Sequence, residues 1–167
     1  MADDLRDLAA RLGRALADRG LMLATAESCT GGLVSCLVTD IAGSSAWFAG
    51  GVVSYTNAAK CRILGVPQAV LDTRGAVSRE TVLAMAKGAR GIFGADLALA
   101  VSGIAGPDGG TPEKPVGTVW MAWDGPCGAR AEVHHFEGGR LDVKGAAAKT
   151  ALAAALALVV ESRSDPA

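Results

Sequence analysis

Hydrophobic residues recur along this chain with two different spacings, and the change from one to the other predicts the elements. Four leucines near the start follow helical spacing and predict a helix over 4–19 that ends at a glycine; they are Leu5, Leu8, Leu12 and Leu16. The continuous apolar run that follows, over 21–26, predicts a buried strand. The chain therefore opens with a helix followed by a strand.

The later pattern continues this alternation of helices and strands. It predicts helices over 31–39, 57–64, 78–94 and 141–162, and strands over 47–55, 96–102, 116–123 and 129–136. The last two strands flank a short turn and predict a hairpin. With neither a linker nor a repeat, we predict one α/β domain over 1–162 and a frayed tail over 163–167. We expect three layers, with a mixed, mostly parallel sheet covered by helices on both faces.

Composition narrows the class of protein. Half of the 167 residues are hydrophobic and the net charge is −1, so nothing indicates the clustered basic surface that nucleic acid requires. The acidic start MADDLRDL is unlike a signal peptide. The most apolar tract, over 151–160, is shorter than the ~20 residues of a membrane span. We expect a soluble, cytoplasmic protein with no nucleic-acid or membrane partner.

The residues that bind metals are few and scattered. The four cysteines form no C-x-x-C pair, and the two histidines are adjacent in a predicted strand, where neighbouring side chains point to opposite faces. We therefore expect no metal site and reduced cysteines.

The stretch TAESCTGG crowds hydroxyl groups and a thiol between a predicted strand and a predicted helix. Ser28 would lie near the backbone N–H groups of Thr30, Gly31 and Gly32, which could hold an oxyanion or a phosphate. Alternatively, Ser28 or Thr30 could simply cap the helix. Cys29 is a rival nucleophile, but no well-placed histidine is available to activate it.

A serine nucleophile needs a base, and Lys60 in the segment SYTNAAK is the candidate. Serine–lysine pairs are known variants of the catalytic triad. A lysine acts as a base near neutral pH only when burial or a nearby cation lowers its pKa. The alternative is an ordinary solvated lysine on a helix.

Two further segments carry candidate binding residues. The loop 103–115 is rich in glycine, including Gly103 and Gly106, which permit close approach of the backbone to a ligand. Ser102, at the end of the preceding strand, could aid proton transfer or only satisfy the backbone. Arg140, before the last helix, could bind a phosphate or carboxylate or be a surface charge.

Four segments in order resemble the CinA C-terminal domain family: TAESCTGG, GGVVSYTNAAK, GAVSRE and SGIAGPDGGTPEKPVGTVW. The resemblance covers almost the whole chain. Enzymatic members are nicotinamide-nucleotide amidohydrolases, so it implies hydrolysis of the carboxamide of nicotinamide mononucleotide (NMN) to nicotinic acid mononucleotide and ammonia. It implies no cofactor. It also implies a homo-oligomer, with a dimer favoured, and the stand-alone form of the domain.

The resemblance also implies roles for individual residues. Ser28 matches the nucleophile and Lys60 its base, while Tyr55 and Ser102 match supporting positions near the reacting centre. Arg140 matches an arginine that helps to bind or orient substrate.

This sequence departs from the family pattern close to Arg140. Gly139 stands where relatives commonly have aspartate, and Lys144 where they commonly have arginine. These departures leave open a catalytically silent module that binds a nucleotide or a partner.

Overall fold

Five strands form one open sheet in the computed structural model, which describes residues 2–161 and their side chains from residue 4. The strands are β1 (Leu23–Glu27), β2 (Phe48–Val53), β3 (Leu97–Gly103), β4 (Thr118–Gly125) and β5 (Gly128–His135). Their order is β2-β1-β3-β4-β5. β1 is parallel to both of its neighbours, whereas β4 is antiparallel to β3 and β5. Four of these five strands therefore point the same way, which confirms the mixed, mostly parallel sheet.

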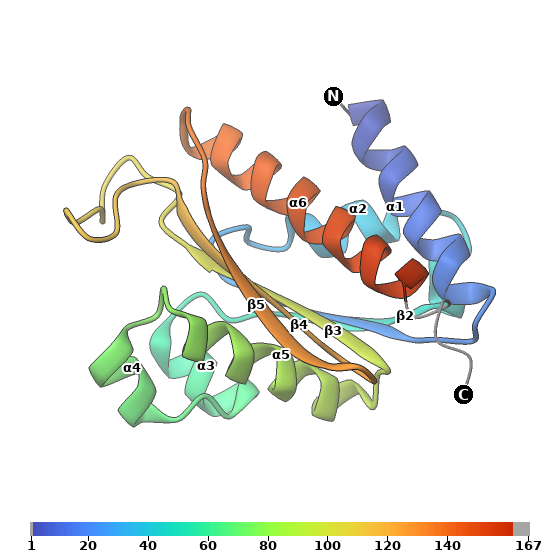
Figure 1. The fold of residues 1–167 in the computed structure, drawn as a ribbon, viewed down its shortest axis with the longest axis horizontal. Coiled ribbons are helices and arrows are strands. Elements are labelled where there is room, and N and C mark those ends of the chain that lie inside the picture. Colours follow the sequence, from blue (N-terminus) through green and yellow to red (C-terminus); the bar gives the residue numbers. More distant parts are fainter. Residues whose placement is uncertain (1, 162–167) are drawn as a thin grey trace.

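Helices cover both faces of the sheet and confirm the three layers (Figure 1). One face carries α1 (Ala2–Ala17), α2 (Leu33–Thr39) and α6 (Arg140–Glu161); the other carries α3 (Asn57–Leu64), α4 (Gln68–Arg74) and α5 (Arg79–Phe93). A short 3₁₀ turn, Ser44–Ala46, precedes β2. The sequence does not predict α4, because its seven residues bury only Leu71 and show no period. The predicted tail over 163–167 lies outside the described residues.

The two faces of the sheet carry side chains of different size. On the α5 side the central strands present mainly alanines, such as Ala24, Ala26, Ala98 and Ala100. On the α1 and α6 side they present larger residues, such as Leu23, Leu99 and Val101. Small side chains let a helix pack close to the strands, so α5 lies tightly against β1, β3 and β4.

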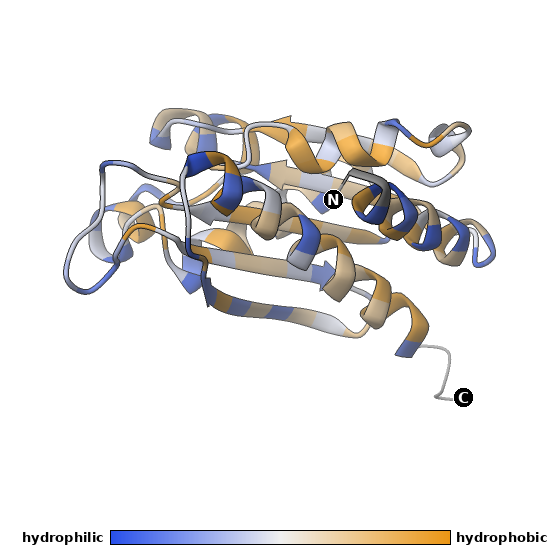
Figure 2. Cartoon of the chain, turned by 90° about the horizontal axis from the view of Figure 1, so that it is seen from above, coloured by the Kyte–Doolittle hydropathy of each residue, from blue (hydrophilic) through white to orange (hydrophobic). Residues whose placement is uncertain are grey.

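Helix α6 is long and apolar enough to cross a membrane by length and composition. In this fold it packs on the sheet instead, with Val143, Ala147, Ala151 and Ala155 fully buried. The buried Trp123 of β4 donates its Nε1–H to the carbonyl of Ala151 at 3.1 Å. Hydrophilic residues lie at the beginning of α6, and its later turns are mostly hydrophobic (Figure 2). Such burial is the property of a core helix.

The short helix α3 is held at both ends. The hydroxyl of Thr56 caps its start by accepting from the N–H of Ala59 at 3.1 Å. At its end, α5 approaches so closely that a Cβ on Gly88 would lie 2.0 Å from the carbonyl oxygen of Leu64. Glycine at this crossing therefore fixes the position of α3, and with it that of Lys60.

Candidate active site

The turn after β1 carries Ser28 at the edge of the sheet where the parallel strands end. The N–H of Ser28 donates to the carbonyl of Val101 in β3 at 2.9 Å, which extends the β1–β3 pairing past the end of β1. Gly31 and Gly32 then take φ values of +64° and +95°. Side chains other than glycine are strained in this region, so the sharp turn into α2 depends on both glycines.

Glu27 belongs to the candidate site, and the sequence did not single it out. Its side chain is fully buried, and its carboxylate accepts hydrogen bonds from the N–H groups of Gly32 and Val34, both at 3.0 Å. It also accepts from the N–H of Ser35 at 2.8 Å and the hydroxyl of Ser35 at 2.7 Å. The carboxylate therefore satisfies the start of α2 and ties it to the residue before Ser28. Neither Ser28 nor Thr30 caps this helix. The available signal was an acidic residue at the end of an apolar strand, one turn before the start of the next helix.

Lys60 reaches the Ser28 side chain from the neighbouring helix α3. Its Nζ donates to Ser28 Oγ at 2.9 Å and to the carbonyl of Ser54 at 2.8 Å, with the carbonyl of Tyr55 at 3.4 Å. The residue is 1% exposed. The Ser54 N–H in turn donates to the carbonyl of Glu27 at 2.8 Å. The segments after β1 and β2 are thus joined through this one lysine.

The surroundings of Lys60 favour its neutral form. Burial lowers the pKa of the amine below its ordinary value of 10.5. Within the described part of the chain, no carboxylate forms an ion pair with it. A buried amine with a lowered pKa, at hydrogen-bond distance from a hydroxyl, has the geometry of a general base beside its nucleophile.

Cys29 has the opposite electrostatic setting. The side chain is 6% exposed, and burial raises the pKa of its thiol to about 11, more than the neighbouring backbone amides lower it. The thiol is therefore protonated at neutral pH, and only the thiolate is a good nucleophile.

The amides of the turn divide into bonded and open groups. The N–H of Gly31 donates to the carbonyl of Ser28 at 3.1 Å, and that of Gly32 to the carboxylate of Glu27. Two N–H groups, those of Cys29 and Thr30, donate to no backbone or side-chain oxygen among the described residues, and both lower the pKa of the Cys29 thiol. The Thr30 hydroxyl is also buried without a partner there. The open donors thus lie earlier in the turn than Gly31 and Gly32.

Arg140 forms hydrogen bonds with two of the other candidate residues. Its guanidinium donates to the hydroxyl of Tyr55 and to the carbonyl of Gly106, each at 2.8 Å. The three residues are supplied by segments that follow β5, β2 and β3, which all point the same way. Gly106 has φ +81°, and a Cβ there would lie 2.6 Å from Val116. Arg140, Tyr55 and Gly106 therefore meet at one edge of the sheet.

Ser102 and Gly103 make contacts that stabilise the fold. The hydroxyl of Ser102 donates to the carbonyl of Ala76 at 2.8 Å, so it holds the segment between α4 and α5. A Cβ on Gly103 would lie 2.7 Å from Val119, so glycine permits the close pairing of β3 with β4. No hydrogen bond joins Ser102 to Ser28 or Lys60 within the described part of the chain.

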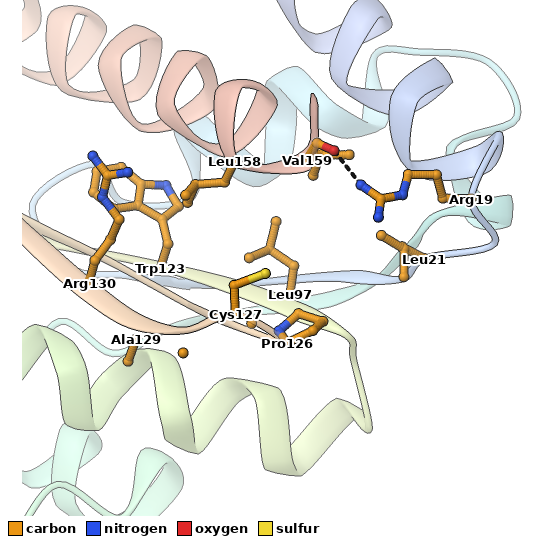
Figure 3. A pocket seen from close by; sticks show the side chains of 12 residues that line it. Arg19, Leu21, Leu97, Trp123, Pro126, Cys127, Ala129, Arg130, Leu158 and Val159 are labelled. Atoms are coloured by element: carbon orange, nitrogen blue, oxygen red, sulfur yellow. Dashed lines mark hydrogen bonds between the residues drawn. The ribbon is translucent and has the colours of Figure 1, made fainter. Parts of the chain in front are cut away.

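Two cavities lie away from the Ser28–Lys60 contact. An apolar one of about 390 Å³ lies near the β4–β5 turn and the end of α6, lined by residues that include Leu21, Leu97, Trp123, Cys127 and Leu158 (Figure 3). A second, of about 380 Å³, lies between Arg74, Arg79, Lys114 and Trp120. Neither is lined by Ser28 or Lys60. No group of three His, Cys, Asp or Glu side chains suited to a metal ion occurs among the described residues.

Fold and site together define a class of protein: an open α/β domain that sets a buried lysine against a serine hydroxyl where its parallel strands end. The family model of the CinA C-terminal domain matches residues 5–159. The chain belongs to the CinA C-terminal domain family.

Individual relatives support this assignment. A nicotinamide-nucleotide amidohydrolase, PncC, of Pseudomonas putida is 50% identical over 85% of this chain and 89% of its own length. A CinA-like protein of Geotalea uraniireducens is 57% identical over 76% of this chain but only 30% of its own length. This chain thus spans about a third of the CinA-like proteins that it matches.

Solved structures show the same fold. The competence/damage-inducible protein CihA from Agrobacterium tumefaciens superposes with a TM-score of 0.88 at 47% identity, covering 93% of this chain and 95% of its own. A CinA-superfamily protein from Klebsiella pneumoniae superposes with a TM-score of 0.91 at 37% identity, covering 94% and 98%.

Proposed function

We propose that this chain hydrolyses the carboxamide of NMN to nicotinic acid mononucleotide and ammonia. The observation that carries the proposal is the contact of 2.9 Å between Lys60 Nζ and Ser28 Oγ, made by a lysine that is 1% exposed. The relative from P. putida, aligned over nearly its whole length, is a nicotinamide-nucleotide amidohydrolase. The substrate is therefore a small molecule, and none of the proposed steps needs a cofactor.

The reaction begins with Lys60 in its neutral form. Its amine takes the proton of the Ser28 hydroxyl along their hydrogen bond, and Ser28 Oγ attacks the carboxamide carbon. The carbonyls of Ser54 and Tyr55 hold the lysine nitrogen in place and stabilise the ammonium that forms. The carbonyl oxygen of the substrate thereby becomes an oxyanion.

The open N–H groups of Cys29 and Thr30 are the donors that we assign to this oxyanion. They belong to the same turn as Ser28 and donate to no oxygen among the described residues, beside the Cys29 thiol. One such donor typically contributes about 100-fold or more to the rate. We retain Gly31 and Gly32 in the site for the turn that their φ values permit, and not for their amides.

Collapse of the intermediate completes the first half of the reaction. The protonated Lys60 gives its proton to the departing nitrogen, so ammonia leaves and nicotinic acid mononucleotide stays esterified to Ser28. Neutral Lys60 then takes a proton from a water molecule as the water oxygen attacks the ester carbon. The bond from that carbon to Ser28 Oγ breaks, Lys60 returns the proton to Oγ, and nicotinic acid mononucleotide leaves. Tyr55 and Arg140 orient the substrate in this scheme, and Ser102 supports the loop beside it.

The test is ammonia release from NMN without added metal. We expect turnover by the wild type and loss of turnover in Ser28→Ala and Lys60→Ala variants that keep their folded circular-dichroism spectrum. Cys29→Ala is the matched control and should stay active. Binding of NMN without turnover by a folded wild type would instead indicate the silent module. The homo-oligomer stays a prediction, which sedimentation of the purified chain tests.

A further inference from the structure

The apolar cavity near the β4–β5 turn lies apart from the Ser28 site. Leu97 lines it from the first residue of β3, whereas Ser28 follows the last residue of β1, a strand parallel to β3. The cavity and the Ser28–Lys60 contact are therefore at opposite ends of these strands. Figure 3 shows the cavity between the end of α6, the segment that follows α1 and the β4–β5 turn. Its volume of about 390 Å³ is within the range of small-molecule sites, roughly 300–1,000 Å³.

Large apolar side chains line this cavity without projecting from the surface. Leu97, Trp123 and Val159 are buried. Leu21 and Leu158 are half-buried. A protein partner docks on apolar side chains that its own surface can reach, whereas recessed side chains are reached only by a molecule small enough to enter. The cavity therefore suits a small molecule and not a protein surface.

The polar side chains around the cavity already have partners. The indole N–H of Trp123 donates to a backbone carbonyl of α6, and the guanidinium of Arg19 donates to another. The guanidinium of Arg130 forms an ion pair with Glu132. A charged ligand would lose its hydration on entering and would compete with these partners for its polar contacts. The surroundings therefore favour a neutral, apolar ligand.

We propose that this cavity is a binding site for a small neutral molecule of fused apolar rings, the size of naphthalene. An apolar cavity of about 150 Å³ holds a single benzene ring, so the volume here has room for a larger ring system. Trp123 supplies an aromatic surface and Cys127 a polarizable sulfur, and both contact aromatic rings favourably. Removal of the rings from water drives the binding. The site is separate from the proposed function and does not depend on it.

Alkylation of Cys127 by iodoacetamide, followed by mass spectrometry, tests the proposal on the wild type. The thiol is exposed in the free protein and lines the cavity, whereas exposed Cys36 lies on α2 and is the internal control. We expect saturating naphthalene to slow alkylation of Cys127 by about five-fold or more, because a bound ring covers the sulfur. The rate at Cys36 should not change. The charged analogue 2-naphthoate should give little protection.

Four results of this experiment would overturn the inference. Unchanged alkylation of Cys127 would show that the cavity does not bind the rings, and equal slowing at Cys36 would show an effect that is not local. Equal protection by 2-naphthoate would contradict a neutral ligand. A Cys127 that fails to react before any probe is added, while Cys36 reacts, would show that the protein itself or a second copy already covers the cavity.

A substitution that fills the cavity gives a second, independent test. Leu158→Trp places a larger ring in it from α6, and Val160→Trp is the matched control, because Val160 lies in the same turn but is exposed and does not line the cavity. Naphthalene should raise Tm by about 1–3 °C in the wild type and in Val160→Trp, and should leave Tm of Leu158→Trp unchanged. An equal rise in all three proteins would overturn the inference. If Leu158→Trp does not fold, the alkylation of Cys127 in the wild type decides alone.

Discussion

Glu27→Gln is the substitution that tests most directly how the serine turn is held. The carboxylate accepts four hydrogen bonds, whereas the glutamine side chain has one acceptor oxygen and an NH₂ group. A glutamine side chain here would lose least with its oxygen facing the N–H groups of Gly32 and Val34 and its NH₂ group facing Ser35. The Ser35 hydroxyl can then turn to accept, but the Ser35 N–H is left facing another donor.

The magnitude follows from these contacts. A buried N–H without an acceptor destabilises by about 1–3 kcal/mol. Loss of the negative charge at the start of α2 adds about 0.3–1 kcal/mol. We therefore expect the free energy of unfolding to fall by about 1–4 kcal/mol, which for a chain of this size lowers Tm by roughly 3–15 °C.

Urea unfolding followed by tryptophan fluorescence measures this change. Glu80→Gln is the matched control, because Glu80 lies in the first turn of α5 but its side chain is 43% exposed and faces Arg74 at 3.7 Å. Its loss should stay within about 1 kcal/mol. If Glu27→Gln destabilises no more than Glu80→Gln, the carboxylate does not hold the turn and our account of it is wrong.

Three further predictions concern titration, reactivity and packing. Burial lowers the pKa of Lys60, so between this lowered pKa and 10.5 the unfolded chain keeps a proton that the folded chain has lost. The free energy of unfolding should therefore rise with pH across this range. Urea midpoints should show no such rise in Lys60→Met. The thiol of Cys29, with its pKa raised to about 11, should resist iodoacetamide at neutral pH in the folded protein while exposed Cys36 reacts, as read by mass spectrometry. Gly51→Ala should destabilise the protein by about 1–3 kcal/mol, since its Cβ would lie 2.3 Å from a threonine hydroxyl. Gly145 lies in open space on α6, so Gly145→Ala should stabilise the protein by up to about 1 kcal/mol. Thermal melts measure both changes.

Much of the fold could be predicted because its signals are local. The leucines of α1 and the N-cap Ser78 of α5 depend on neighbours within one or two helical turns. The strands β1 and β3 were visible as apolar runs because both of their faces are covered. Helix α4 escaped prediction because its position depends on the α5 surface that covers it and not on a period of its own.

The sequence predicted which residues belong to the candidate site, but not which of them are in contact. The stretch TAESCTGG is compatible both with a nucleophile and with capping by Ser28 or Thr30, and the structure excludes capping because the Glu27 carboxylate bonds to the start of α2. The turn amides were predicted as a group. The structure separates those of Gly31 and Gly32, which already have acceptors, from those of Cys29 and Thr30.

The sequence by itself determined the five strands, the helices other than α4, the three-layer class and the family, because periodicity, turn residues and motif order are properties of neighbouring positions. Only the tertiary structure decided which distant residues meet. Ser28 and Lys60 are 32 positions apart, and Tyr55 and Arg140 are 85 apart. They meet because β2, β1, β3 and β5 point the same way, so the segments that follow these strands emerge at one edge of the sheet. Burial at that edge then lowers the pKa of Lys60, a change that depends on the folded surroundings of the residue and not on its neighbours in the chain.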